Sequence, residues 1–397
     1  MAFSQIPPFR SWGEIVIERV ANKRIVDIDW LMVAIVAGLS VGSVVMVASA
    51  SHVNLTGDPS YFYARQSVWF LIGFGVLFYS LRIDYAEYTQ HWKQLYFVGI
   101  GLLVLVSLTG AVTNGAKSWF QIGPLRLEPA ELMKIILILT MASLLENTES
   151  ALSNKQLLQA LSVAGLPVFL VILQPDLGTA LMMSAIAFGI LWARGIGRKQ
   201  AAALLAVGSL AAGTFAALFV VKKELFFKLV HPYQWERLTL FLHPQIRETG
   251  MGAGYQLHQS MLAIGAGQIW GEGIFKGIQT QGAWIPERHT DFIFSVVAEE
   301  LGFAGACLLL AAYFALLWRM IKIGREARDS MGALIVAGVL SMFLAQVFEN
   351  VGMTMSIMPI TGITLPLMSY GGSSILSSML AIGLVLNVGY HRKKIKF

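Results

Sequence analysis

The chain has 397 residues, of which 56% are hydrophobic and only 13% are charged. A soluble globular domain carries about 25% charged residues, so this composition cannot cover a water-facing surface and excludes soluble, disordered and nucleic-acid-binding proteins. The single cysteine, Cys307, also excludes a disulfide scaffold. We therefore expect an all-α polytopic membrane protein, with membrane lipid as its surroundings and no nucleic acid as a partner.

A membrane-spanning helix needs about 20 mostly apolar residues. Ten segments meet or approach this requirement, and we expect each to cross the bilayer. They are 30–50, 67–81, 95–112, 130–145, 159–173, 177–193, 201–221, 291–318, 331–349 and 373–390. The residues before them, 1–29, are expected to form a cytoplasmic N-terminal segment, and residues 30–397 a single membrane domain.

Ten crossings place both termini on the same side of the membrane, and the distribution of lysine and arginine indicates which side. With the termini inside, the inner segments hold eighteen lysines and arginines, whereas the short outer loops hold only Arg65, Lys117 and Arg126. The large loop at about 222–290, between the seventh and eighth spans, then lies outside. Its first part, Lys222–Leu242, has the pattern of an amphipathic helix that lies in the membrane interface.

Ionisable residues at the ends of the spans are the first candidates for a site. Glu131 and Lys134 are three residues apart and share a helix face. They either form a structural ion pair or line a polar cavity. Asp176, between the fifth and sixth spans, either caps the sixth helix or belongs to a site on the outer face.

The run Ile285–Phe294 carries the strongest signal, because it places Asp291 where the polar loop meets an apolar helix. Partial desolvation should raise the pKa of this carboxyl group, while the neighbouring Arg288 and His289 should lower it. Such opposing influences suit a general base, although Asp291 could also cap the following helix. Glu299 lies on roughly the same face and has either a structural or a catalytic role.

The segment 358–374 contains two prolines and three glycines, which interrupt any helix. Irregular backbone at membrane depth is tolerated only where it is buried or lines a cavity. The amides near Ser369, Gly371 and Gly372, at the start of a following helix, could bind a phosphate. A tight re-entrant turn is the structural alternative.

Several familiar signatures are absent from the sequence. The segment Gly271–Gly277 fits neither a phosphate-binding loop nor a dinucleotide fingerprint. No Cys/His cluster and no HExxH motif supports a zinc site, so no metal ligands are assigned. The short inner loops disfavour nucleotide chemistry on the cytoplasmic side, which favours a lipid-borne substrate handled from outside.

Together, these motifs resemble the SEDS family (shape, elongation, division and sporulation), and within it the elongation branch, RodA. The resemblance covers nearly all of the chain from about Trp30. It includes the segments Asn114–Trp119, Glu128–Lys134, Leu173–Ala180, Pro232–Gln234, Gly254–Ser260, Gly277–Gln279, Pro286–Phe303, Asn350–Met353 and Pro366–Ser373. The chain departs from the family in having Glu128 where glutamine is usual, and Glu272 where a Gly-Lys-Gly run is usual.

The resemblance implies a peptidoglycan glycosyltransferase of the bacterial cytoplasmic (inner) membrane, active on its periplasmic face in cell elongation and rod shape. The substrate would be lipid II, a disaccharide-pentapeptide on undecaprenyl pyrophosphate. The partner would be a class B penicillin-binding protein, a transpeptidase. The family's essential carboxylate corresponds to Asp291.

A glycosyl transfer that inverts the anomeric carbon of the donor sugar needs one base for the acceptor hydroxyl. We expect Asp291 to act as this catalytic base. The pyrophosphate needs cations or amides, and a divalent cation, Mg²⁺ or Mn²⁺, could share that task. The residues expected to bind the substrate or shape its cavity are Lys117, Arg126, Glu131, Lys134, Asp176, Arg288, His289, Glu299, Ser369, Gly371 and Gly372. A lipid II flippase and a non-enzymatic scaffold that activates the transpeptidase are the alternatives.

Overall fold

The structure is a computed structural model of the whole chain. It describes residues 27–53, 60–113, 116–123, 125–146, 152–221, 223–229, 232–242 and 252–392. The predicted N-terminal segment lies almost entirely outside the described residues.

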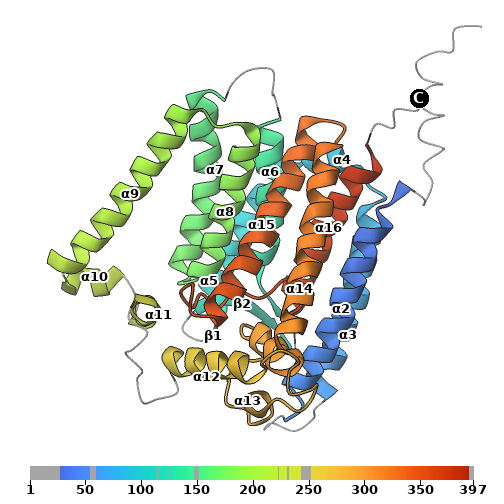
Figure 1. Cartoon of the computed structure of the whole chain (residues 1–397). Coiled ribbons are helices and arrows are strands. Elements are labelled where there is room, and N and C mark those ends of the chain that lie inside the picture. The colour runs from blue at the N-terminus through green and yellow to red at the C-terminus, as the bar shows by residue number, and fades with distance from the viewer. Residues whose placement is uncertain are drawn as a thin grey trace, which may run out of the picture.

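The architecture is mostly helical, and the long helices lie side by side in a bundle (Figure 1). Each of the ten predicted spans coincides with one long helix. The long helices are α2 (Trp30–Ala50), α3 (Ser60–Ser80), α5 (Trp92–Thr109), α6 (Pro129–Leu144), α7 (Asn154–Leu173), α8 (Leu177–Arg194), α9 (Arg198–Val221), α14 (Ile293–Arg325), α15 (Ser330–Thr354) and α16 (Gly372–Tyr390).

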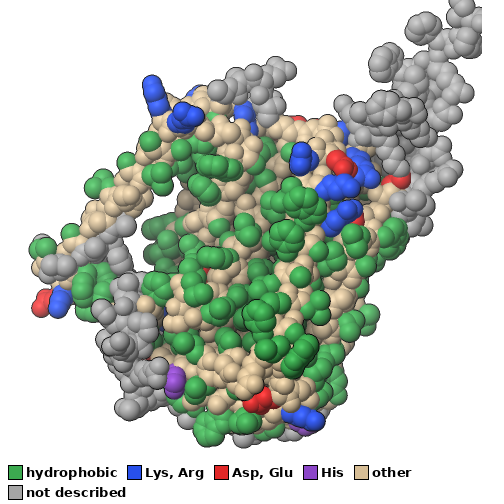
Figure 2. Space-filling model, viewed as in Figure 1, with side chains coloured by type: hydrophobic (Ala, Val, Ile, Leu, Met, Phe, Trp, Pro, Cys, Tyr) green, Lys and Arg blue, Asp and Glu red, His purple; other side chains and the backbone are tan. Residues whose placement is uncertain are grey.

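Among the described residues, seven helices are long and apolar enough to cross a membrane: α2, α5, α7, α8, α14, α15 and α16. The chain is therefore an integral membrane protein, while the crossing of α3, α6 and α9 remains a prediction. Hydrophobic side chains cover the sides of the bundle, and charged side chains gather near its two ends (Figure 2). This is the distribution that a bilayer around the middle of the bundle requires.

The core lies among α6, α8, α15 and α16, whose inward-facing side chains are almost all buried. The helix α9 behaves differently, because it extends away from the other helices (Figure 1). Its far end meets the short helices α10 (Lys223–Leu229) and α11 (Pro232–Leu242). The predicted amphipathic helix Lys222–Leu242 is thus two helices rather than one.

The expectation of an all-α fold is wrong in one place, because the loop after α5 forms a small antiparallel sheet. Its strands are β1 (Ala111–Thr113), β2 (Ala116–Ile122) and β3 (Leu125–Leu127), in the order β1-β2-β3. Phe120 pairs with Leu127 across two of the strands. Strands rich in β-branched and aromatic residues around Asn-Gly are a recognised hairpin signal, and this signal is present at 111–122.

The remaining elements lie close to the ends of the bundle. The loop between α11 and α14 contains α12 (Ala253–Ala266) and α13 (Ile278–Gln281), at the bottom of Figure 1. A six-residue helix, α4 (Tyr85–Gln90), lies at the opposite end, as do the first residue of α2 and the last residue of α16. The loop with α12 and α13 leads directly into the candidate site.

Candidate functional site

Asp291 ends the loop between α13 and α14, two residues before α14 begins. The side-chain amide of Asn350, near the end of α15, donates to the carbonyl of Asp291 (2.8 Å) and to the carbonyl of Ile363 (2.7 Å). Ile363 belongs to the irregular segment between α15 and α16. One fully buried amide therefore holds the Asp291 loop, α15 and this segment together.

The carboxylate of Asp291 converges with the guanidinium of Arg237 at Gly362. A methyl group on Gly362 would lie 3.3 Å from Asp291 Oδ2 and 3.4 Å from Arg237 Nη1. Gly362 has a φ of +77°, a backbone conformation that glycine adopts without strain. Arg237 comes from α11, and sequence analysis missed it; the available signal was a charged residue in the predicted amphipathic helix of the large loop.

The surroundings of Asp291 raise the pKa of its carboxyl group above the ordinary value for aspartate. Burial raises its pKa, and the carboxylate of Glu287 raises it further, while the charge of Arg237 and a hydrogen bond from Thr290 lower it, to a value of about 6. Its side chain is nevertheless partly exposed. Asp291 is therefore a stronger base than an ordinary aspartate and remains accessible to a reactant.

Two further carboxyl groups lie within electrostatic range of Asp291, at the starts of α6 and α8. Asp176 caps α8, accepting from the backbone N–H of Thr179 (3.0 Å). Burial, Asp176 and Glu131 together hold the pKa of Glu128 well above its usual range. This shift favours the neutral form of the Glu128 side chain, which then resembles the glutamine usual in the family.

Glu131 and Lys134 form the predicted ion pair, with 2.7 Å between Oε1 and Nζ. Lys134 is only 1% exposed, and Glu131 is also buried. The hydroxyl of Ser377 on α16 donates to the other oxygen of Glu131 (2.5 Å). The ion pair and Ser377 together join α6 to α16.

Residues just before Asp291 are held against the segment that precedes α16. The hydroxyl of Ser369 donates to the carbonyl of Thr290 (2.6 Å), and the backbone N–H of Tyr370 donates to the carbonyl of His289 (2.9 Å). The ring of His289 lies 4.5 Å from that of Phe62 and 5.7 Å from that of Tyr370, between centroids. Burial lowers the pKa of His289, which favours its neutral form.

Two of the predicted site residues are engaged in holding the loop. Arg288 donates to three backbone carbonyls, among them that of Ala50 at the end of α2 (2.5 Å). The carboxylate of Glu299 accepts from the backbone N–H groups of Gln279 (2.6 Å) and Thr280 (3.0 Å), at the start of α13. The Arg288 and Glu299 side chains thus tie this loop to α2 and α13.

One cationic residue, Arg126, contacts the start of α16, and another, Lys117, is on the neighbouring strand β2. Lys117 on β2 and Arg126 on β3 are exposed, and Ser373 on α16 donates to the carbonyl of Arg126 (3.4 Å). Burial raises the pKa of Tyr370, whereas a hydrogen bond with Arg65 and the charge of Arg126 lower it. Arg65 is therefore a second cation that sequence analysis missed, because it was placed in a loop rather than in α3.

Gly371 and Gly372 lie where the backbone enters α16. Among the described residues, no side chain caps the first turn of this helix. Trp69 packs so closely that a methyl group on Gly372 would lie 2.4 Å from its Cε2 atom. The backbone N–H groups of this turn have no partner within the helix, and they can bind an anion.

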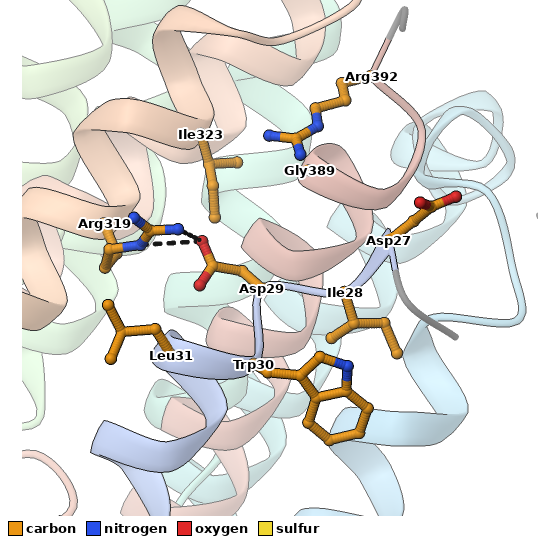
Figure 3. A pocket seen from close by; sticks show the side chains of 9 residues that line it. All are labelled: Asp27, Ile28, Asp29, Trp30, Leu31, Arg319, Ile323, Gly389 and Arg392. Carbon is orange, nitrogen blue, oxygen red and sulfur yellow. Dashed lines mark hydrogen bonds and ion pairs between the residues drawn. The ribbon is translucent and has the colours of Figure 1, made fainter. Parts of the chain in front are cut away.

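A pocket of about 190 Å³ lies at the opposite end of the bundle, between the start of α2 and the ends of α14 and α16 (Figure 3). Asp29 caps α2, accepting from the N–H of Met32 (3.0 Å), and forms an ion pair with Arg319. None of the predicted site residues lines this pocket, so the candidate site is at the end of the bundle that contains Asp291.

Comparison with known proteins identifies the family of the chain. Residues 29–394 match the family model of the cell cycle proteins FtsW, RodA and SpoVE. The chain is 34% identical to MrdB, a peptidoglycan glycosyltransferase of Escherichia coli K12, over 93% of this chain and 95% of the relative. It is 38% identical to a probable peptidoglycan glycosyltransferase FtsW of Halorhodospira halophila, over 92% and 91%.

Two solved structures share the fold. The first comes from a study of polymerization and crosslinking by a peptidoglycan synthase complex. It has a TM-score of 0.73 and 32% identity, and the match covers 91% of this chain and 97% of that one. The second is the rod shape determining protein RodA of Thermus thermophilus, with a TM-score of 0.66 and 30% identity over 92% and 98%.

Proposed function

Because the chain belongs to the FtsW, RodA and SpoVE family, we propose that it is a peptidoglycan glycosyltransferase that polymerises lipid II with Asp291 as its general base. The relatives that carry this activity in their names match almost the whole of this chain. The observation that carries the assignment of the base is the environment of Asp291. Its side chain is partly exposed, its pKa is about 6, and it converges with Arg237 at Gly362.

In the proposed reaction, Asp291 accepts the proton of the 4-hydroxyl group of an acceptor sugar. The hydroxyl oxygen forms a bond to the anomeric carbon of the donor sugar, and the bond from that carbon to the pyrophosphate oxygen breaks. The configuration inverts, so no sugar–enzyme intermediate is required. With a pKa of about 6, about nine tenths of Asp291 is ionised at pH 7, and it can therefore act as a base at that pH.

The leaving pyrophosphate carries negative charge that the protein must stabilise. The exposed side chain of Arg126 and the amides of the first turn of α16, which no side chain caps among the described residues, support binding of this group there, and Lys117 on β2 is exposed as a further cation. Arg65, which hydrogen bonds with Tyr370, adds a further positive charge. Among the described residues, no group of three His, Cys, Asp or Glu side chains is placed to hold a metal ion, and a divalent cation here would need the pyrophosphate oxygens as ligands.

The other predicted residues are proposed to shape the site rather than react. Glu131 and Lys134 hold α6 against α16, and Asp176 holds the start of α8. His289 and Ser369 join the Asp291 loop to the segment before α16. Glu299 and Arg288 anchor the loop, and we assign Arg288 no contact with the substrate because its hydrogen bonds go to backbone carbonyls.

The proposed topology has ten crossings, with both termini in the cytoplasm and Asp291 on the periplasmic face of the inner membrane. It rests on the excess of lysine and arginine in the inner segments. The solved neighbour from a peptidoglycan synthase complex supports a class B penicillin-binding protein as partner. The proposed role in elongation rests on the residues of the motifs that resemble RodA. Overall identity does not support it, since identity to MrdB is 34% and identity to FtsW is 38%.

The test uses purified protein in detergent with labelled lipid II, where transport across a membrane has no meaning. The proposal expects long glycan strands from the wild-type protein and none from Asp291→Asn. Strands from neither protein, even with a cognate transpeptidase added, would favour the flippase or scaffold alternative. Equal strand formation by both proteins would remove Asp291 from the mechanism while leaving the enzyme class intact.

A further inference from the structure

The segment that follows α12 is joined to α14 through backbone hydrogen bonds on both sides of Gly302. The N–H groups of Phe303 and Ala304 donate to the carbonyls of Gln268 (2.8 Å) and Ile269 (3.0 Å). In the other direction, two loop N–H groups donate to carbonyls of α14, Glu272 to Glu299 and Gly273 to Glu300, both at 3.0 Å. The loop thus supplies the partners that α14 loses at its break.

This junction requires glycine on both sides. Gly302 interrupts α14 with a φ of +67°, and Gly271 in the loop has a φ of +78°. A methyl group on Gly271 would lie 2.2 Å from the carbonyl oxygen of Glu300, and one on Gly302 would lie 2.3 Å from the nitrogen of Gly271. The two backbones are therefore in direct contact. Irregular backbone inside a bilayer is tolerated when its polar groups are satisfied in this way.

The depth of the junction can be measured along α14. Trp318 is exposed beside Arg319 and Lys322, which is the arrangement expected where a span meets one membrane surface. Fifteen residues of helix separate Trp318 from Phe303, and at about 1.5 Å per residue this is about 22 Å. The hydrocarbon core is about 30 Å thick. Phe303 and Ala304 therefore lie within the hydrocarbon, and so does Ile269, whose carbonyl accepts from the N–H of Ala304.

A second estimate of the depth of the loop comes from the length of α2. This helix starts at Trp30, on the same side of the membrane as the end of α14. The N–H of Phe275 donates to the hydroxyl of Ser49 (3.0 Å), one residue before the end of α2. Ser49 is nineteen residues from Trp30 along α2, which corresponds to a distance of about 28 Å along the helix. The loop thus runs from inside the hydrocarbon core at Ile269 to the boundary of the core at Phe275, on the side opposite Trp30. This agrees with the depth estimated along α14.

The side chains on this loop are those expected in contact with lipid. Trp270 is 82% exposed and Ile269 is 60% exposed, and they adjoin Phe303 on α14, which is 67% exposed. We infer that residues 268–275 are embedded in the leaflet nearer α13, with Ile269 and Trp270 among the acyl chains of membrane lipids. Because Glu299 joins this part of α14 to α13, the embedded loop fixes the height of the Asp291 loop relative to the membrane.

The inference is tested with single-cysteine variants in a Cys307→Ala background, because Cys307 is exposed. Ile269→Cys, Trp270→Cys and the matched control Lys276→Cys each receive a nitroxide label. Lys276 is exposed in the same loop, just beyond the predicted boundary. The purified proteins are reconstituted alone into phosphatidylethanolamine–phosphatidylglycerol vesicles, and collisions with oxygen and with a water-soluble nickel chelate present on both sides are measured.

The expected result is loss of collision with the nickel chelate at positions 269 and 270, with frequent collision with oxygen, and the reverse at position 276. Nickel collision at 269 and 270 equal to that at 276 would overturn the inference, and would make this patch a water-exposed surface for a protein partner. Exclusion of both reagents would overturn it as well, because it would indicate contact with a second copy of the chain. Two independent label positions guard against a folding defect in one variant.

Discussion

Replacing Arg237 should change the pH dependence of the reaction rather than simply lower its rate. Two atoms that lie within 3.3 and 3.4 Å of one point are at most 6.7 Å apart, and so Asp291 Oδ2 and Arg237 Nη1 interact at short range. At 6.7 Å the attraction is about 0.6 kcal/mol in water and about 2.5 kcal/mol at an effective dielectric constant near 20. This corresponds to a shift of about 0.5–2 pH units.

The direction follows from the charge. Arg237 lowers the pKa of Asp291 to its value of about 6, and so Arg237→Gln should raise it to between about 6.5 and 8. The base must be ionised, so activity falls below the pKa about tenfold per pH unit. The acid limb of kcat/KM should move upward by the same amount, while the plateau at higher pH should be largely retained.

The measurement is the initial rate of lipid II polymerisation in detergent between pH 5 and 9. Arg237→Lys is the matched control, because it keeps the charge and should keep the limb near that of the wild type. An Arg237→Gln variant that lost the same factor at every pH would show a merely structural role. A limb that stayed at its original pH would refute the electrostatic reasoning.

Three further predictions concern the surroundings of Asp291. Glu128→Gln should keep most of the activity at neutral pH, since the raised pKa of Glu128 favours the neutral form that glutamine reproduces, whereas Glu128→Lys should lose it. Glu131→Gln should lower stability by about 3–5 kcal/mol by leaving Lys134 buried and unpaired, and adding Lys134→Met should restore much of the melting temperature in detergent. Gly362→Ala should slow turnover, because the methyl group strains the backbone by about 1–3 kcal/mol and crowds the Asp291 carboxylate. Gly42→Ala, whose nearest new contact is Met368 at 3.9 Å, should leave the rate unchanged.

The helical bundle could be predicted from the sequence because a span is a local property. A run of apolar residues identifies it without knowledge of its neighbours, and the ten predicted segments coincide with long helices. The predicted all-α fold class omitted the sheet at 111–127. The sequence carried a local signal for it, because β-branched and aromatic residues on both sides of Asn114-Gly115 are typical of a hairpin.

The position of Asp291 could also be predicted, because a carboxylate at the border of loop and apolar helix is visible in the sequence. Arg237 was visible as a charge in the predicted amphipathic helix, but its proximity to Asp291 was not, since nothing in the sequence of α11 indicates that this helix folds against Gly362. Arg65 was missed for a simpler reason. The polar residues that open α3 were read as loop, which moved the predicted start of that span from Ser60 to residue 67.

Proximity in sequence to Asp291 proved a weak guide to contact with it. Arg288 is three residues from Asp291, yet its guanidinium binds the carbonyls at the end of α2. Glu299 lies on a suitable helix face, but its carboxylate is occupied by the start of α13. In both cases the orientation depends on loop geometry that brings distant backbone groups to the side chain, and helical periodicity carries no information about that geometry.

The most direct test of the account is the initial rate of lipid II polymerisation by Asp291→Asn, with Asp291→Glu as the variant that keeps the carboxylate. A positioned base contributes about 10²–10⁴-fold, so the amide variant should be slower by at least that factor, while the glutamate variant should keep part of the activity. The account is contradicted if the asparagine variant, folded and stable in detergent, forms glycan strands at the wild-type rate.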